Sequence, residues 1–315
     1  MKEVNNKILV LGSNGLVGSS IKDSEYLNSN HKIFYSSRND TDLSNIDEFI
    51  NLFKNTEPNI VINCAGKVGG IVANSQNKFD FLFENLKITM NFFEILKNYS
   101  NLRIINFGSS AIYPKDANNP LKEDYLMSGE LEPTNSAYSL SKIVSIELGR
   151  NLKQNNIDVI NLIPTNLYGP YDNFDHTTSH VVPGLISKIH KAKMDEEEEY
   201  LVWGSGKPLR ELLYAEDLVR AIEVVLKDKV RDFDVINIGS GSEISIKNLA
   251  NLVKDVVGFK GKLKFDDSKP DGVTRKILDS SKIKSLNWEP TTTLQEGLET
   301  TYEWFLNNEN WNIPI

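Results

Sequence analysis

The chain has 315 residues, of which 40% are hydrophobic, enough to bury a sizeable core in one large domain or two closely packed lobes. Its formal charge of -8 argues against a nucleic-acid partner, because phosphate binding requires a net basic surface. A single cysteine excludes an intramolecular disulfide, and no apolar run reaches the roughly 18 residues of a membrane span. With no apolar signal region before the first predicted strand, we expect a soluble cytoplasmic protein.

Residues 7–11 predict a short apolar strand, and Gly12-Ser-Asn-Gly15-Leu-Val-Gly18 follows it before a helical pattern. A strand, a glycine-rich turn and a helix in this order are typical of a dinucleotide-binding entrance. Gly12 makes the tight turn, Gly15 lets the backbone approach a pyrophosphate, and Gly18 lets helix and strand pack closely. The free N–H groups at the helix N-terminus then face the phosphates.

The second predicted strand, residues 32–35, is followed by two serines and Arg38. An NAD enzyme usually carries an acidic residue here, which holds the ribose 2′-hydroxyl, and this chain has none. Two hydroxyls and a guanidinium could instead hold a 2′-phosphate, which favours NADPH as the cofactor. Asp42 and Leu43 follow, at a position where they could contact the edge of the adenine ring.

Residues 59–63 predict a buried strand that leads into Cys64-Ala65-Gly66. Small residues at the carboxyl end of a parallel strand leave room for a ligand at the switch point of the sheet. We interpret Cys64 as a small buried residue and not as a redox or catalytic group.

Residues 79–99 predict a long amphipathic helix, and the next strand, 103–107, ends just before Ser109. Downstream, Tyr138 and Lys142 are four residues apart, which places them one turn apart on the same face of a helix. A neighbouring ammonium favours the phenolate, so the pair predicts a general acid with a pKa below the usual value of about 10. The Ser109 hydroxyl could hydrogen-bond a substrate carbonyl while Tyr138 donates the proton.

The strand pattern continues with residues 158–163 and the segment Pro164-Thr-Asn-Leu-Tyr-Gly-Pro170. Strands that alternate with helices up to this point predict a Rossmann-type, doubly wound parallel sheet in an α/β fold. A helix at 216–226 and a strand at 235–239 return to the same sheet.

From residue 171 the pattern changes to polar loops, an acidic run at 195–199 and a glycine turn at 203–206. We interpret the acidic run as a solvated surface segment. These features suggest that a smaller C-terminal α/β lobe binds the substrate. The expected dinucleotide-binding domain is 1–170 plus about 211–240, and the expected substrate lobe is about 171–210 plus 241–315.

Several strings resemble motifs of the extended short-chain dehydrogenase/reductases, and among them of the GDP-L-fucose synthases, over the chain from about residue 7 to about residue 298. These strings are residues 66–74, 131–135, 164–174, 179–182 and 202–206. An enzyme of that family epimerises GDP-4-keto-6-deoxymannose at C3 and C5 and then reduces C4 with NADPH. The resemblance therefore implies an NADPH-dependent oxidoreductase that acts on a GDP-linked 4-keto-6-deoxy sugar in deoxysugar or capsule polysaccharide biosynthesis.

Carried over residue by residue, the resemblance implies catalytic roles for Ser109, Tyr138, Lys142 and His180. Lys142 would also bind the nicotinamide ribose, and residues 164–167 would line the nicotinamide. The implied cofactor contacts are Gly12, Asn14, Gly15, Leu16, Val17, Gly18, Arg38, Asp42, Leu43, Ala65, Gly66, Lys142, Pro164, Asn166, Leu167 and His180. The implied substrate contacts are Ser109, Ser110, Asn166, Lys188, Trp203, Arg210 and Asp271, and no metal is implied.

The position two residues after the serine departs from the family pattern. The family has a cysteine there as the base that takes protons from C3 and C5, whereas this chain has Ala111. A methyl group accepts no proton, and a positioned base contributes on the order of 10²–10⁴-fold. His180 matches the family's partner acid, so half of the epimerising pair is present. We hypothesise that the chain keeps C4 reduction and has lost most or all epimerisation.

A second departure is Asn14, where the fucose synthases carry an arginine near the 2′-phosphate. The substrate of a reductase without epimerase activity could be the manno-configured ketone, or a sugar that another enzyme has already epimerised, including a 6-deoxyheptose. The local sequence does not choose among these.

Other functions are compatible with parts of the sequence. A bifunctional 3,5-epimerase/4-reductase would use His180 or another group in place of the missing cysteine. A 4-epimerase would share the Ser-Ala segment but usually has an acidic residue after the second strand, and a 4,6-dehydratase would need an Asp-Glu pair that is missing after Ser109. A non-catalytic dinucleotide sensor is disfavoured by the intact Ser109, Tyr138 and Lys142.

The resemblance also implies a homodimer, in which the helices near 79–99 and 137–153 of two copies form a four-helix interface. From the sequence alone, amphipathic helices of this kind serve equally well to cover a sheet.

Overall fold

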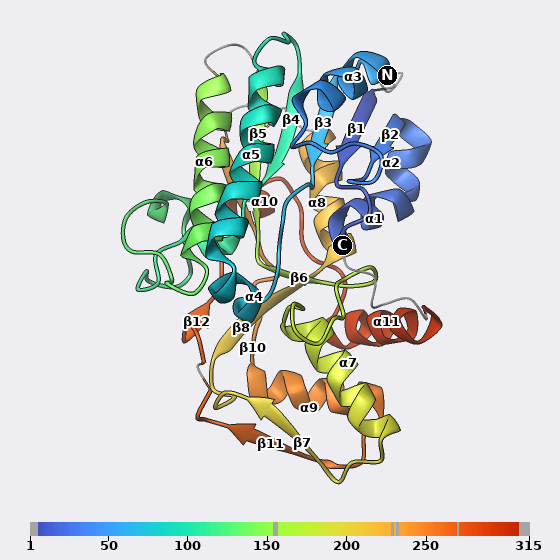
Figure 1. Ribbon diagram of the computed structural model, residues 1–315, viewed down its shortest axis with the longest axis vertical. Helices are drawn as coiled ribbons and strands as arrows, with labels where there is room; N and C mark the ends of the chain where they lie inside the picture. The colour runs from blue at the N-terminus through green and yellow to red at the C-terminus, as the bar shows by residue number, and fades with distance from the viewer. Residues whose placement is uncertain (1–5, 154–156, 228–229, 231–232, 270, 309–315) are drawn as a thin grey trace.

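The computed structural model describes residues 6–153, 157–227, 230, 233–269 and 271–308. Two groups of strands lie along its long axis (Figure 1), with a large sheet at one end and smaller sheets at the other. Strand β6 follows β5 of the large sheet directly in the chain and pairs with β8 of the smaller group, so the two groups are joined through this segment.

The large sheet has six parallel strands in the order β2-β1-β3-β4-β5-β9. The chain adds β2 on one side of β1 and then crosses to place β3 on the other side, so the topological switch point lies between β1 and β3. Its strands are β1 (Lys7–Leu11), β2 (Lys32–Ser36), β3 (Ile60–Asn63), β4 (Arg103–Phe107), β5 (Asp158–Pro164) and β9 (Val235–Ile238). The predicted doubly wound parallel sheet is confirmed.

Side chains alternate between the two faces of the sheet, and each face has its own layer of helices. Ile8 and Val10 of β1 pack in one core cluster, whereas Leu9 and Leu11 pack in the other. The helices of the first face are α1 (Leu16–Asp23), α2 (Glu25–Asn30), α8 (Ala215–Lys227) and α10 (Ser281–Lys284). The helices of the second face are α3 (Ile46–Thr56), α5 (Lys78–Leu96) and α6 (Ser136–Leu152), and three short helices lie in the connections: α4 (Ile71–Gln76), η1 (Ser110–Ile112) and η2 (Glu123–Tyr125).

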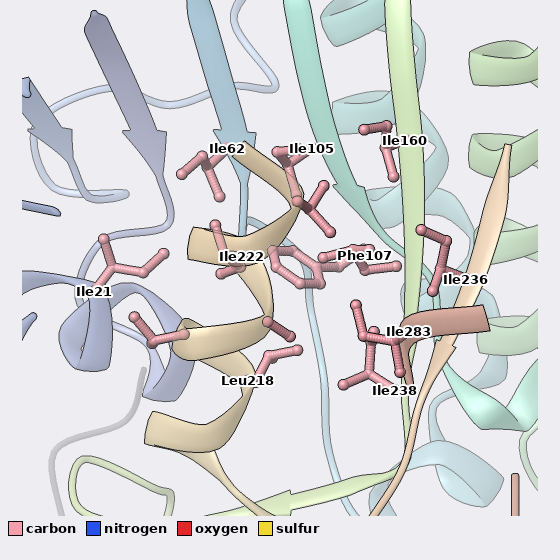
Figure 2. Packing of buried hydrophobic residues seen from close by; sticks show 14 of the residues in the cluster. Ile21, Ile62, Ile105, Phe107, Ile160, Leu218, Ile222, Ile236, Ile238 and Ile283 are labelled. Atoms are coloured by element: carbon pink, nitrogen blue, oxygen red, sulfur yellow. The ribbon is translucent and has the colours of Figure 1, made fainter. Parts of the chain in front are cut away.

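Helix α8 is fixed to the first face by large apolar side chains. Figure 2 shows Leu218 and Ile222 of α8 beside Ile62, Ile105 and Phe107 of β3 and β4. All five are buried, and burying a side chain of this size stabilises the fold by about 1.5–3 kcal/mol. This packing holds the central strands, whose carboxyl ends carry the candidate site.

The smaller group of strands has a separate core. In it, β7 (Glu199–Trp203) pairs with β11 (Lys262–Asp266), and β8 (Leu209–Tyr214) pairs with β6 (Asn166–Tyr168), β10 (Glu243–Ser245) and β12 (Arg275–Lys276). The helices of this part are α7 (Val181–Met194), α9 (Ile246–Val257) and α11 (Leu294–Asn307). Phe174, Ile186, Val253 and Phe305 are among its buried residues.

Local sequence signals explain where these helices begin and end. The side chain of Ser245 accepts a hydrogen bond from the N–H of Asn248 at the start of α9, and Gly258 ends that helix with a φ of 75°. Thr293 and Glu296 form a reciprocal capping box at the start of α11. Of the acidic run, residues 195–198 are exposed as expected, while Glu199 begins β7 and forms an ion pair with Lys264.

The predicted strands of the large sheet agree with the observed ones to within one or two residues at each end. The expected division into two lobes includes residues 1–5 and 309–315, which lie outside the described residues. No helix in the described part of the chain is both long and apolar enough to cross a membrane.

Gly12, directly after β1, is the position where a side chain should be least tolerated. It has a φ of +71°, and a Cβ there would lie 2.7 to 2.8 Å from backbone atoms of Cys64 and Ala65. We expect Gly12→Ala to lower the free energy of unfolding by about 1–3 kcal/mol through backbone strain, with the clash adding to this. Urea denaturation measures the change.

Gly15→Ala provides the matched control, because a Cβ at Gly15 meets only the Gly12 carbonyl oxygen, at the ordinary distance of 3.6 Å. Equal unfolding midpoints for the two variants would contradict the strain assigned to Gly12.

Candidate active site

Three polar side chains meet where β4 ends and α6 begins. Tyr138 and Lys142 lie one turn apart near the start of α6, and Ser109 follows β4 after one glycine. The hydroxyl groups of Ser109 and Tyr138 are hydrogen-bonded to each other. The Nζ of Lys142 donates a hydrogen bond to the carbonyl oxygen of Phe107 at 3.0 Å. The fold thus brings together the three residues that the sequence singled out.

The protonation of this group differs from the expectation. Desolvation raises the pKa of Tyr138 to about 12, and the hydrogen bond with Ser109 offsets only part of the increase. Desolvation also lowers the pKa of Lys142 to about 8. The expected lowering of the Tyr138 pKa by Lys142 is absent, because the ammonium is bound to the Phe107 carbonyl and lies 5.9 Å from the centre of the phenol ring. Tyr138 is therefore a neutral phenol at pH 7, the form that donates a proton.

Ala111 connects this group to the backbone that follows β4. Its N–H donates to the Oγ of Ser109 at 3.2 Å, and its carbonyl accepts a hydrogen bond from the Oγ of Ser139 on α6 at 2.9 Å. Ala111 is 8% exposed, and the adjacent Ser110 is buried as well. The position where the resemblance implies a thiol thus carries a methyl group, on a backbone that is held from both sides.

The glycine turn between β1 and α1 lies at the switch point, beside the end of β3. A Cβ at Gly12 would be 2.7 Å from the backbone N of Ala65, and a Cβ at Gly18 would be 2.4 Å from the Gly12 carbonyl oxygen. Helix α1 begins at Leu16, and no side chain caps its first N–H groups. These N–H groups, together with a turn in which backbone approaches backbone, fit the pyrophosphate of a dinucleotide.

The residues expected to meet the adenosine lie at the carboxyl end of β2. Arg38 is exposed and Asp42 is half-buried. Leu43 packs its side chain into the core on the second face of the sheet, so only its backbone is left to face a ligand. Ser37 donates from its N–H and its hydroxyl to Asp40, at 2.9 and 2.6 Å. The serine expected to hold a 2′-phosphate is therefore already paired with a carboxylate.

The expected nicotinamide end lies where β3 and β5 face α6. A Cβ at Gly66, just after β3, would lie 3.6 Å from the Nζ of Lys142, so the switch point and α6 meet here. Asn166 directs its side chain toward the smaller sheet group, where its Nδ2 donates to the carbonyl of Glu211 at 2.9 Å. The other residues expected at this end are Ala65, half-buried, and Pro164 and Leu167, which pack in the fold.

His180 lies just before α7, on a loop that packs against the segment after β3. The N–H of Gly70 donates to the Thr178 carbonyl at 2.8 Å, and a Cβ on Gly70 would lie 2.3 Å from the Ser179 carbonyl oxygen. The His180 side chain is exposed, yet the surrounding protein lowers its pKa by desolvation. The imidazole is therefore accessible and neutral at pH 7, and it can accept a proton.

Trp203 ends β7 with 60% of its surface exposed, and two lysine ammonium groups approach its ring. The Nζ of Lys188 lies 5.9 Å and that of Lys269 lies 5.6 Å from the ring centre. Both distances are within the range of cation–π attraction. This surface combines an exposed aromatic face with positive charge, as a phosphorylated aromatic ligand requires.

Arg210 and Asp271 are engaged by the protein itself. The Nη1 of Arg210 donates to the carbonyls of Leu209 and Val273 at 2.8 and 2.7 Å. The carboxylate of Asp271 accepts hydrogen bonds from the N–H and the hydroxyl of Ser205 at 2.7 and 2.6 Å. These bonds hold together β8, the turn after β7 and the segment before β12, so both residues shape this surface.

Two cations near these positions were not predicted. Lys276 on β12 pairs with Arg210 on β8, and desolvation followed by repulsion from Arg210 lowers its pKa to about 8. The Nζ of Lys22 on α1 donates to the Oδ1 of Asn14 in the glycine turn at 2.8 Å. Neither lysine has a sequence signal, because each reaches its neighbour only through the fold.

Cys64 is half-buried, and desolvation raises its pKa to about 12, which agrees with its interpretation as an inert thiol.

A profile of the NAD dependent epimerase/dehydratase family matches residues 8–239, more than half of the chain. The chain belongs to this family. The match includes the glycine turn and every residue of the Ser109, Tyr138 and Lys142 group. The family assignment also confirms the resemblance on which the sequence-based roles rest.

Proteins named GDP-L-fucose synthases and proteins named GDP-heptose reductases are among those similar to this family member. A GDP-L-fucose synthase of Sinorhizobium fredii is 43% identical over 303 residues, covering 96% of each chain. A crystal structure of a GDP-6-OMe-4-keto-L-xylo-heptose reductase from C. jejuni is 31% identical with a TM-score of 0.88, covering 96% of this chain and 98% of that one. MlghC, a GDP-mannoheptose C4 reductase from Campylobacter jejuni with NADP bound, is 30% identical with a TM-score of 0.85 and the same coverage.

Proposed function

We propose that this enzyme uses NADPH to reduce the C4 ketone of a GDP-linked 4-keto-6-deoxy sugar and does not epimerise C3 or C5. The observation that carries the proposal is the group of Ser109, Tyr138 and Lys142 with a methyl group, Ala111, at the position of the expected base. The names of the relatives support GDP-sugar chemistry, and the heptose reductases among them support reduction at C4.

In this proposal, the bound cofactor supplies the hydride that adds to C4. Tyr138 gives its phenolic proton to the oxygen that becomes an alkoxide, so the ketone gains one hydride and one proton and becomes an alcohol. Ser109 hydrogen-bonds the same oxygen and polarises the carbonyl before transfer. Lys142 stabilises the phenolate that Tyr138 becomes, and it binds the nicotinamide ribose through its ammonium.

The glycine turn would hold the pyrophosphate through Gly12, Gly15 and the first N–H groups of α1. On the other side of the site, Lys188 and the unpredicted Lys276 supply the positive charge for the GDP diphosphate, and Trp203 offers its ring to the base. We assign Arg210 and Asp271 to the support of this surface, because their polar groups are already bound within the protein. The division into a dinucleotide lobe and a sugar lobe is part of the same proposal.

A bifunctional epimerase-reductase is the second candidate, and one observation favours it. His180, which matches the family's partner acid, is exposed and neutral at pH 7, so its imidazole can accept a proton in place of the missing cysteine. Because residue 111 is an alanine, one of the two proton-transfer groups that the family uses is missing. Exchange with solvent at C3 or C5 of the sugar distinguishes the two candidates.

The rate of ketone reduction should fall as the pH rises through about 8, where the desolvated ammonium of Lys142 loses its proton. Tyr138 keeps its proton over this range, since its pKa is about 12, so loss of the acid itself does not explain the fall. The pH profile of kcat/KM measures this. In Lys142→Arg, the side chain stays positively charged to about pH 12, so the decline in kcat/KM should shift to a higher pH or disappear. A wild-type profile that is flat through pH 8 would contradict the role of the Lys142 charge.

We also propose a homodimer formed through α5 and α6. Phe79, Phe83 and Met90 share one side of α5 and are 72%, 55% and 54% exposed, and Leu140 on α6 is 45% exposed. Exposed apolar side chains on one helix surface favour burial against a partner. Phe83→Asp should therefore shift the sedimentation mass from dimer to monomer, and Leu306→Asp on α11, also at an exposed leucine, should leave it unchanged. A monomeric wild type would overturn the proposal.

The proposed function is tested by the oxidation of NADPH with purified protein and a GDP-4-keto-6-deoxy sugar, offered separately as the hexose and the heptose. We expect oxidation with at least one of them, and none with the matching UDP-linked ketone. If neither GDP-linked ketone is reduced, the assignment as a GDP-sugar ketoreductase is wrong.

A further inference from the structure

The carboxyl end of β2 holds a group of charges that the proposed function does not use. The Nζ of Lys22, at the end of α1, donates to the Oδ1 of Asn14 at 2.8 Å and lies 5.7 Å from the centre of the Tyr35 ring on β2. Its charge also contributes to the lowered pKa of Asp40, after the two hydrogen bonds that Asp40 accepts from Ser37. Lys22 thus lies over the glycine turn, within the electrostatic reach of the end of β2.

This end of the site is where a dinucleotide with a 2′-phosphate differs from one without it. The phosphate adds up to two negative charges and three acceptor oxygens, which require cationic or N–H donors. The two serines before Arg38 are not open to a phosphate. Ser36 is buried, and both donors of Ser37 are bound to Asp40.

Asn14 is neutral, and an amide oxygen does not attract a phosphate. However, its Oδ1 holds the ammonium of Lys22 at the turn, so a positive charge lies at the position of the glycine turn after all. The ammonium is on a long, exposed side chain, which can exchange the amide oxygen for a phosphate oxygen without moving the backbone.

We infer that Lys22, held over the glycine turn by Asn14, is the cation that selects the 2′-phosphate of NADPH, and that Asp40 is the anion that the phosphate displaces from Ser37. The displaced carboxylate frees the N–H and hydroxyl of Ser37 as two further donors for the phosphate. This inference deepens the proposed function and rests on its use of NADPH. Lys22 and Ser37 would then share the phosphate with Arg38.

The test is the dissociation constant of the wild type and its variants for NADP⁺ and NAD⁺, by calorimetric titration without any sugar. Lys22→Ala should weaken the binding of NADP⁺ about tenfold, equivalent to about 1.4 kcal/mol, and should leave the dissociation constant for NAD⁺ within about twofold of the wild type. Asp40→Asn should bind NADP⁺ more tightly, since it removes the competing charge while keeping the shape. Lys32→Ala, an exposed lysine at the opposite end of β2, is the matched control and should change neither constant.

The inference would be overturned if Lys22→Ala weakened the binding of NADP⁺ and NAD⁺ equally, or changed neither. Unchanged NADP⁺ binding in Asp40→Asn would also overturn it. Failure of the wild type to bind either nucleotide would overturn the inference and the proposed cofactor together. Because no ketone is present, these results are independent of whether the sugar reduction occurs.

Discussion

Tyr138→Phe should lower kcat for ketone reduction by about 10²–10⁴-fold, the usual contribution of a positioned proton donor. The variant keeps the aromatic ring and removes only the hydroxyl that is hydrogen-bonded with Ser109. Since desolvation keeps this phenol neutral, with a pKa of about 12, the substitution removes an acid and leaves the charge of the site unchanged. NADPH oxidation at saturating ketone measures kcat, and cofactor fluorescence measures NADPH affinity, which should stay within about twofold.

Tyr99→Phe serves as the control for loss of a phenol, because Tyr99 packs on Phe53 at the other end of the central strands. It should retain the wild-type kcat. A fall of less than about tenfold in Tyr138→Phe would show that another group donates the proton and would remove Tyr138 from the mechanism.

Ala111→Cys should introduce exchange of solvent deuterium into C3 or C5 of the keto sugar. The backbone at this position is held by hydrogen bonds to Ser109 and Ser139, so the thiol would be added to a fixed turn. It would lie on the same turn as the Ser109 hydroxyl, to which the N–H of residue 111 donates, and His180 is available as the second proton-transfer group. A positioned base contributes on the order of 10²–10⁴-fold, so exchange should rise by that factor above the wild type. Mass spectrometry of the recovered sugar measures it.

Ala111→Ser is the matched control, because a serine hydroxyl has nearly the size of the thiol but does not ionise near neutral pH. Ala111→Cys combined with His180→Ala tests whether both groups are needed. If Ala111→Cys reduces the ketone normally and still shows no exchange, the methyl group at residue 111 does not account for the proposed absence of epimerisation.

Local signals explain why the large sheet could be predicted. The apolar runs of β1 and β4, the spacing of Gly12, Gly15 and Gly18, and the four-residue spacing of Tyr138 and Lys142 are each complete within a short segment. Such patterns depend on backbone geometry alone, and the observed elements therefore agree with them.

Properties that depend on burial or on distant contacts could not be predicted in this way. The pKa of Tyr138 is raised and not lowered, because desolvation outweighs the hydrogen bond with Ser109 and the Lys142 ammonium is bound to the Phe107 carbonyl. Arg210 was expected to offer its guanidinium to a ligand, and its Nη1 is bound to two backbone carbonyls. Lys276 adjoins Arg210 only through the pairing of β12 with β8, a contact between segments that are far apart in the chain.

The central claim is that this enzyme reduces the C4 ketone and leaves C3 and C5 untouched. The most direct measurement incubates the wild-type protein with NADPH and GDP-4-keto-6-deoxymannose in D2O and records the NMR spectrum of the product as the cofactor is consumed. We expect a C4 alcohol that carries no deuterium at C3 or C5. Deuterium at either carbon would contradict the claim, and His180 would then be the first residue to replace.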